Sequence, residues 1–171
     1  APARERMAQE SLSWLPVDLD PYPVIISVGQ PRSASTFQFV ALCEALRLLR
    51  GRRTMCGPLR PGGRLDSDRA YVLKHHSFRI AAMAFRQHRP RSLVFVTAES
   101  AESFAAEPRL PSPARYVQLY DEFTELGWWF QTVQYAAMFR LGRGQREALL
   151  QHMRYYTVVR RCCGFQASKD W

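Results

Sequence analysis

The chain has 171 residues, of which 47% are hydrophobic and 12% aromatic, so it is long enough for one domain with its own core and too apolar for general disorder. Its formal charge is +9, and nearly all of its basic residues are arginines. This charge favours anionic partners, among them nucleotides, phosphorylated or sulfated substrates, nucleic acid, anionic lipid and acidic proteins. No apolar run approaches the roughly 18 to 20 residues that span a bilayer, so we expect a soluble protein without a transmembrane segment.

The first twenty residues predict a short helix around Glu5 to Trp14, followed by an extended approach to the first strand through three prolines. They contain no apolar core of a secretory signal. Two interpretations of this start stay open: a targeting segment has been removed, which would allow an organellar location, or the chain is part of a longer product. The compartment itself is not determined.

The segment from Pro23 to Arg47 organises the rest of the chain. The β-branched run from Val24 to Val28 predicts a buried strand, and the residues from Phe37 onward predict a mostly buried helix. Between them lies a short polar turn that contains Arg32, Ser33, Ala34, Ser35 and Thr36. The first amides of a helix have no intrahelical partner and carry partial positive charge. An arginine and three hydroxyls beside them predict an anion-binding loop, and the alternative is an ordinary connection whose hydroxyls cap the helix.

The following residues predict two more strands and a helix. Arg47 to Arg64 contains six basic and no acidic residues and is expected to be a basic loop, either solvated or holding an anion. A second strand over Tyr71–Leu73 ends at Lys74, His75 and His76, a helix capped by Ser77 follows, and a third strand spans Ser92–Thr97.

Strands that alternate with helices in this way predict an α/β fold with a short parallel sheet flanked by helices. The carboxyl ends of such strands share one edge, which is where ligands bind. We therefore expect the loop Arg32 to Thr36, the segment Lys74 to His76 and the segment Thr97 to Ser100 to meet at that edge.

The last third of the chain is expected to be helical. Ala98 to Pro113 predicts a loop or broken helix, Arg115 to Leu141 one long aromatic-rich helix, and Gln145 to Cys163 a last helix with Gly164 as its C-cap. We assign the whole chain, 1–171, to one domain with an α/β core over 22–100 and a helical part over 115–164. The aromatic and basic side chains of this part are either core or a surface for other proteins of a complex.

Four cysteines, Cys43, Cys56, Cys162 and Cys163, show no spacing typical of a zinc site. We interpret them as reduced structural thiols, and we expect no metal. The charge alone would permit nucleic-acid binding, but no recognition motif supports it.

The loop Pro31-Arg32-Ser33-Ala34-Ser35-Thr36-Phe37 resembles the 5′-phosphosulfate-binding loop of the sulfotransferase family, with Ala34 in place of the family's glycine. The segment from Tyr71 to His76 is similar to the family's strand that ends in Lys-x-His, which implies catalytic roles for Lys74 and for His76 or His75. The resemblance covers about residues 22–100. It implies a P-loop-like fold, the donor 3′-phosphoadenosine-5′-phosphosulfate and sulfuryl transfer to a hydroxyl acceptor.

One expected element of that family is missing. At the end of the third strand, where the family binds the 3′-phosphate through an arginine, the chain has Thr97 and Ser100 as hydroxyl donors and Glu99 as a repelling charge. Two hypotheses therefore stay open: a sulfotransferase-like enzyme, and a catalytically degenerate member that serves as an accessory subunit of a larger complex. A P-loop hydrolase is a weaker third alternative because there is no Walker lysine.

Overall fold

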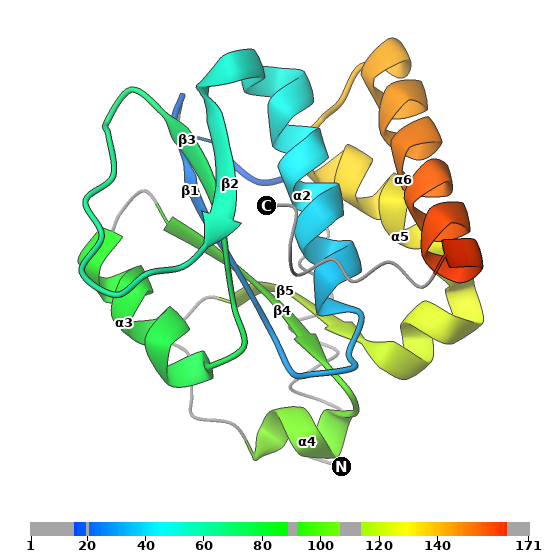
Figure 1. The fold of residues 1–171 in the computed structure, drawn as a ribbon, viewed down its shortest axis with the longest axis horizontal. Helices are drawn as coiled ribbons and strands as arrows, with labels where there is room; N and C mark the ends of the chain where they lie inside the picture. The colour runs from blue at the N-terminus through cyan, green and yellow to red at the C-terminus, as the bar shows by residue number, and fades with distance from the viewer. Residues whose placement is uncertain (1–15, 20, 89–91, 107–113, 164–171) are drawn as a thin grey trace.

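A computed structural model describes the backbone of residues 16–19, 21–88, 92–106 and 114–163 (Figure 1). The helix predicted around Glu5 to Trp14 and the predicted C-cap Gly164 lie outside these residues. The fold is α/β: a five-stranded, all-parallel sheet is flanked by helices, and two of the helices form the C-terminal part. This confirms the predicted fold class.

The sheet has the strand order β2-β3-β1-β4-β5, so β1 occupies its centre. Every residue of β1 is buried, which explains its β-branched composition because both faces of a central parallel strand are covered. The strands span Val24–Gly29 (β1), Thr54–Pro58 (β2), Ala70–His75 (β3), Ser92–Ala98 (β4) and Ala114–Leu119 (β5).

The helices lie on both faces of the sheet. In Figure 1, α2, α5 and α6 lie on one side of the sheet, α3 covers the other side, and the short α4 follows the end of β4. Their bounds are Ser35–Arg50 (α2), Phe78–His88 (α3), Ala101–Ala105 (α4), Tyr120–Met138 (α5) and Arg143–Cys163 (α6), and a short 3-10 helix, η2, spans Gly51–Arg53.

Two apolar clusters hold these layers together. The larger cluster joins α2, α5 and α6 to the sheet and contains the fully buried Leu42, Phe95, Tyr135 and Met153. The smaller cluster joins α3 to the opposite face of the sheet. Because α2 is buried on most of its surface, its first turn, which follows the short loop after β1, is fixed relative to the sheet.

The expected long helix over Arg115 to Leu141 is wrong in its first part. Ala114–Leu119 forms β5, which pairs with β4, and the helix begins only at Tyr120. The helix is then interrupted at Gly127, whose φ of 76° and ψ of 163° are not helical.

The predicted basic loop after α2 also contains structure, because Thr54–Pro58 forms the edge strand β2. The interpretation of all the cysteines as reduced is wrong for one pair: Cys43 in α2 and Cys56 in β2 form a disulfide, with their Cα atoms 6.1 Å apart. The side chains of Cys162 and Cys163 lie outside the described part of the chain.

Candidate functional site

The loop between β1 and α2 leaves the first turn of α2 without a side-chain cap. Ala34 is the N-cap residue with φ 60° and ψ 24°, and Arg32 also has a positive φ of 65°. The hydroxyls of Ser33, Ser35 and Thr36 were expected to be able to cap this helix, but no side chain makes a cap hydrogen bond there. The left-handed conformation at Ala34 is the one that glycine adopts most easily.

The Ser33 and Thr97 hydroxyls hold the loop against β4. Ser33 Oγ donates its hydrogen to the Gln30 carbonyl oxygen at 2.6 Å. Because a hydroxyl has only one hydrogen, Thr97 Oγ1 is the donor in the 2.7 Å hydrogen bond between the Thr97 and Ser33 hydroxyls. Both side chains are fully buried. The structure therefore brings Thr97 to the loop, as the sequence predicts, but in an internal contact.

Gln30 connects the same loop to the start of α4. Its Oε1 accepts from the Glu99 amide at 3.0 Å and from Ser103 Oγ at 2.8 Å. Ser100 is the N-cap of α4 and accepts from the Ser103 amide, so its hydroxyl caps a helix. Glu99 is exposed.

Lys74 connects the end of β3 to the first turn of α2. Its Nζ donates to Thr36 Oγ1 at 2.7 Å, although the two residues are far apart in the sequence. Both side chains are half-buried. This contact confirms the prediction that the ends of β1 and β3 meet at one edge, and it adds an ammonium charge to the positive end of the helix dipole.

The two histidines after Lys74 have different hydrogen bonds. His76 Nδ1 lies 2.7 Å from the Gly29 carbonyl oxygen, and since a carbonyl only accepts, Nδ1 carries the hydrogen and Nε2 of the neutral ring is the acceptor. His75 has the opposite arrangement, because its Nδ1 accepts from the Ser77 amide at 2.8 Å. Its Nε2 therefore carries the hydrogen when the ring is neutral.

The pKa of His75 is lowered by burial of the ring and, to a smaller extent, by the neighbouring His76. Desolvation favours the neutral form, so His75 stays uncharged at neutral pH. With its acceptor nitrogen already bonded, it is poorly suited to take a proton. The backbone partners thus distinguish the two adjacent histidines: the acceptor nitrogen of a neutral His75 is bonded to the Ser77 amide, whereas the backbone contact of His76 uses its N–H.

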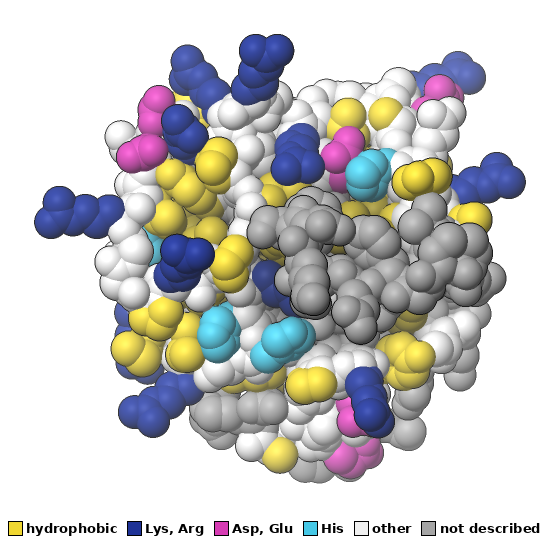
Figure 2. Space-filling model, viewed as in Figure 1, with side chains coloured by type: hydrophobic (Ala, Val, Ile, Leu, Met, Phe, Trp, Pro, Cys, Tyr) yellow, Lys and Arg dark blue, Asp and Glu magenta, His cyan; other side chains and the backbone are white. Residues whose placement is uncertain are grey.

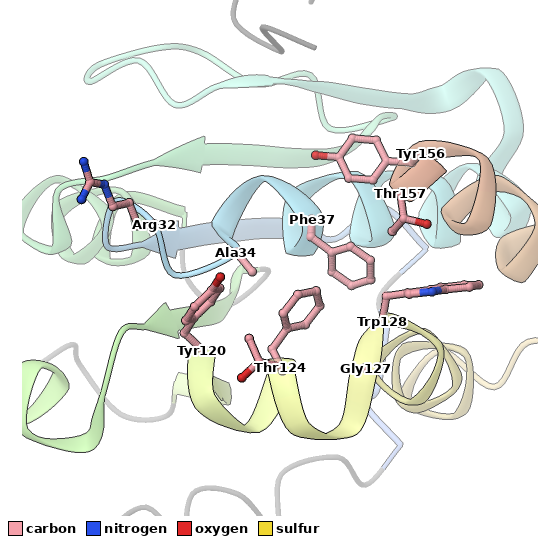
Figure 3. A pocket seen from close by; sticks show the side chains of 10 residues that line it. Arg32, Ala34, Phe37, Tyr120, Thr124, Gly127, Trp128, Tyr156 and Thr157 are labelled. Atoms are coloured by element: carbon pink, nitrogen blue, oxygen red, sulfur yellow. The ribbon is translucent and has the colours of Figure 1, made fainter. Parts of the chain in front are cut away.

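A pocket of about 720 Å³ lies beside the loop, on the side of β1 that faces β5. Aromatic side chains from three helices line it: Phe37 from α2, Tyr120, Phe123 and Trp128 from α5, and Tyr156 from α6. In Figure 3, Phe37 from α2 and Tyr120 from α5 point into the space between these helices, and Arg32 lies at one end with its guanidinium directed away from that space. The ring centroids of Phe37 and Phe123 are 4.9 Å apart. The aromatic composition of α5 therefore forms a pocket wall, which its sequence pattern did not distinguish from core.

The irregular backbone of Gly127 shapes this pocket. Gly127 lines the pocket at the point where α5 bends between the segment that carries Tyr120 and the segment that carries the fully buried Tyr135. The φ of 76° at this residue requires glycine.

Basic side chains are dispersed over the face of the molecule shown in Figure 2. Acidic side chains are fewer on this face, and the basic ones form no single continuous patch there. Arg32 is exposed. Within the described residues no group of three or more His, Cys, Asp or Glu side chains could hold a metal ion, and none of the helices there is long and apolar enough to cross a membrane.

The geometry defines a parallel α/β protein of the Rossmann or P-loop-like type, with a polar loop at the carboxyl edge of its sheet. No protein-family model matches the chain, and a search of curated proteins gave no match. The function must therefore be argued from the residues of this site.

Proposed function

We propose that the protein is a sulfotransferase-like enzyme that binds 3′-phosphoadenosine-5′-phosphosulfate and transfers its sulfuryl group to a hydroxyl acceptor. The observation that carries this proposal is the 2.7 Å bond from Lys74 Nζ to Thr36 Oγ1. It places a lysine beside the uncapped first turn of α2, and the loop that leads into this turn contains the exposed Arg32. An ammonium group, a guanidinium and free helix amides favour a phosphosulfate oxyanion at this point.

The proposed chemistry uses His76 as the base. Its Nε2 takes the proton of the acceptor hydroxyl as the acceptor oxygen forms a bond to sulfur and the bond from sulfur to the bridging phosphate oxygen breaks. Lys74 and the amides of α2 stabilise the negative charge that develops on the bridging oxygen. The products are a sulfate ester and adenosine 3′,5′-bisphosphate.

The positions of His76 and the pocket divide the site into two sides. His76 follows β3, on one side of β1, whereas the aromatic pocket lies on the side of β4 and β5. With the phosphosulfate at the loop, the acceptor approaches from the His76 side, and the pocket receives the nucleoside. The exposed Tyr120 would stack on a nucleobase, and the fully buried Phe37 would support the pocket wall behind it.

The 3′-phosphate has no comparable binding group at the end of β4. Thr97 is fully buried and bonded to Ser33, Ser100 caps α4, and Glu99 is an exposed negative charge. This arrangement favours the second candidate, an accessory subunit that keeps the fold without the chemistry. Large exposed apolar side chains on the C-terminal helices also favour it, namely Trp129, Tyr155 and Val158.

Calorimetric titration with adenosine 3′,5′-bisphosphate tests the site. The Arg32→Ala and Lys74→Ala variants should each bind at least about tenfold more weakly, because a hydrogen bond to a charged group contributes about 1.5–3 kcal/mol. Arg154→Ala, an exposed arginine on α6, is the matched control and should bind like the unmodified protein. Equal losses in all three variants would contradict the assigned site.

A transfer assay separates the two candidates. Radiolabelled donor with a panel of phenols and alcohols should give labelled esters, and His76→Gln should remove that activity while nucleotide binding is kept. Nucleotide binding without any transfer, or recovery of the native protein only within one stoichiometric complex, would favour the accessory role instead.

A further inference from the structure

The disulfide joins the middle of α2 to the middle of the edge strand β2. Cys43 is buried, whereas Cys56 is half-buried on a strand that pairs only with β3 in the described sheet. The position of β2 therefore depends on one ladder of hydrogen bonds, on its contacts with α2 and on this covalent bond. Of the two cysteines, Cys56 is the more exposed, so a reductant would reach the disulfide from its side.

The ladder of β2 leads directly to the proposed anion site. Pro58 is in register with Lys74, and the amide of Leu59 donates to the Lys74 carbonyl oxygen at 2.8 Å. The Lys74 side chain in turn bonds to Thr36, about two turns before Cys43 in α2. These links form a closed ring from Thr36 along α2 to Cys43, across the disulfide to Cys56, along β2 to Leu59, and through Lys74 back to Thr36.

We propose that the Cys43–Cys56 disulfide positions Lys74 at the first turn of α2, so that its oxidation state controls how tightly the anion is bound. This inference rests on the proposed function for the identity of the ligand. A dithiol reductant breaks the S–S bond with two electrons and two protons, giving two thiols in the protein and one disulfide in the reductant. The ring is then open, while the pairing of β3 with β1 keeps Lys74 in the sheet.

Lysine labelling tests the inference without any nucleotide. The chain has two lysines, Lys74 and Lys169, so acetylation with an N-hydroxysuccinimide ester followed by mass spectrometry reports Lys74 with Lys169 as an internal reference. We expect the acetylation rate of Lys74, relative to that of Lys169, to rise severalfold in dithiothreitol and to return to its original value on reoxidation. An unchanged ratio would overturn the proposal.

Nucleotide affinity provides the second readout, measured below the melting temperature of both forms. Reduction should weaken binding of adenosine 3′,5′-bisphosphate severalfold in the unmodified protein and leave the already weak binding of Lys74→Ala unchanged. An equal fall in both proteins would indicate general loosening and overturn the positioning role. No binding even in the oxidised form would refute the proposed function, while the labelling result would still decide the inference.

The Cys43→Ala/Cys56→Ala variant separates this pair from the other two cysteines. It should reproduce the labelling ratio of the reduced protein and no longer respond to dithiothreitol. A remaining response would assign the effect to other thiols and contradict the proposal. If this variant fails to fold, the chemically reduced protein still provides both readouts.

Discussion

Replacing Gly29 with alanine tests how closely the anion loop is packed against the sheet. A Cβ at this position would lie 1.9 Å from Thr97 Oγ1 and 2.6 Å from Ser35 Cβ, so neighbouring atoms must move. Overpacking of this kind costs about 1–3 kcal/mol. Displacing Thr97 also disturbs its buried bond to Ser33, and an unsatisfied buried group costs a further 1–3 kcal/mol or so. We therefore expect Gly29→Ala to lower the free energy of unfolding by about 3 kcal/mol.

Urea unfolding at equilibrium measures this change, and Gly57→Ala provides the matched control. Gly57 also lies in a strand, but a Cβ there meets no atom within 4 Å, so its substitution should change stability little. In a Gly29→Ala/Thr97→Ala protein the loss should be smaller than the sum of the single losses, because the closest obstacle is gone. Equal stability of the two glycine variants would refute the reasoning.

Three further changes test other parts of the structure. The pKa of His75 in the folded protein is lowered from 6.5, so the unfolded chain binds this proton more readily and the free energy of unfolding should fall as the pH drops below about 6.5. Urea unfolding at pH 5 and pH 7 should show a smaller difference in the free energy of unfolding for His75→Gln than for the unmodified protein. The same difference in both proteins would contradict this assignment. Because the disulfide closes a loop with a sequence separation of 13, replacing Cys43 and Cys56 with alanine should lower the free energy of unfolding by about 3 kcal/mol. A loss below about 1 kcal/mol would argue against the disulfide. Gly127→Ala should lower the free energy of unfolding, measured by thermal unfolding, by about 1–3 kcal/mol, because alanine rarely adopts this backbone conformation. Gly144→Ala in α6 is the control and should not lower it. Similar losses in both variants would contradict the special backbone conformation of Gly127.

The central part of the fold is predictable because its signals are local. The buried run of β1, the polar turn and the apolar helix follow one another directly in the sequence, and the end of β3 is marked by Lys74. The meeting of these segments at one edge follows from the general geometry of parallel sheets.

The two outer strands could not be predicted in the same way. β2 contains Gly57 and Pro58, which are poor strand residues, and it forms only because β3 offers a partner edge. Across β5 and the start of α5, the spacing of Tyr116, Leu119 and Phe123 matches a helix, and only pairing with β4 makes Ala114–Leu119 a strand. Such long-range pairing overrides local preference.

The details of the site depend on contacts between distant residues. Nothing local in the sequence distinguishes His75 from His76, because their roles depend on the Ser77 amide and the Gly29 carbonyl. The disulfide likewise requires α2 to bring Cys43 beside an edge strand that the sequence does not reveal.

The bend at Gly127 divides α5 into a segment that mainly lines the pocket and a segment that mainly packs in the core. The segment after it contains the fully buried Tyr135 and Met138 and contributes only its first residue, Trp128, to the pocket, whereas the segment before it contributes Tyr120 and Phe123. A substitution at the exposed Tyr120 can therefore alter the shape of the pocket with less repacking of the interior than one at Phe123, which packs against the buried Phe37. Related chains could acquire different ligand preferences by changes at exposed positions in the roughly two helical turns before this bend.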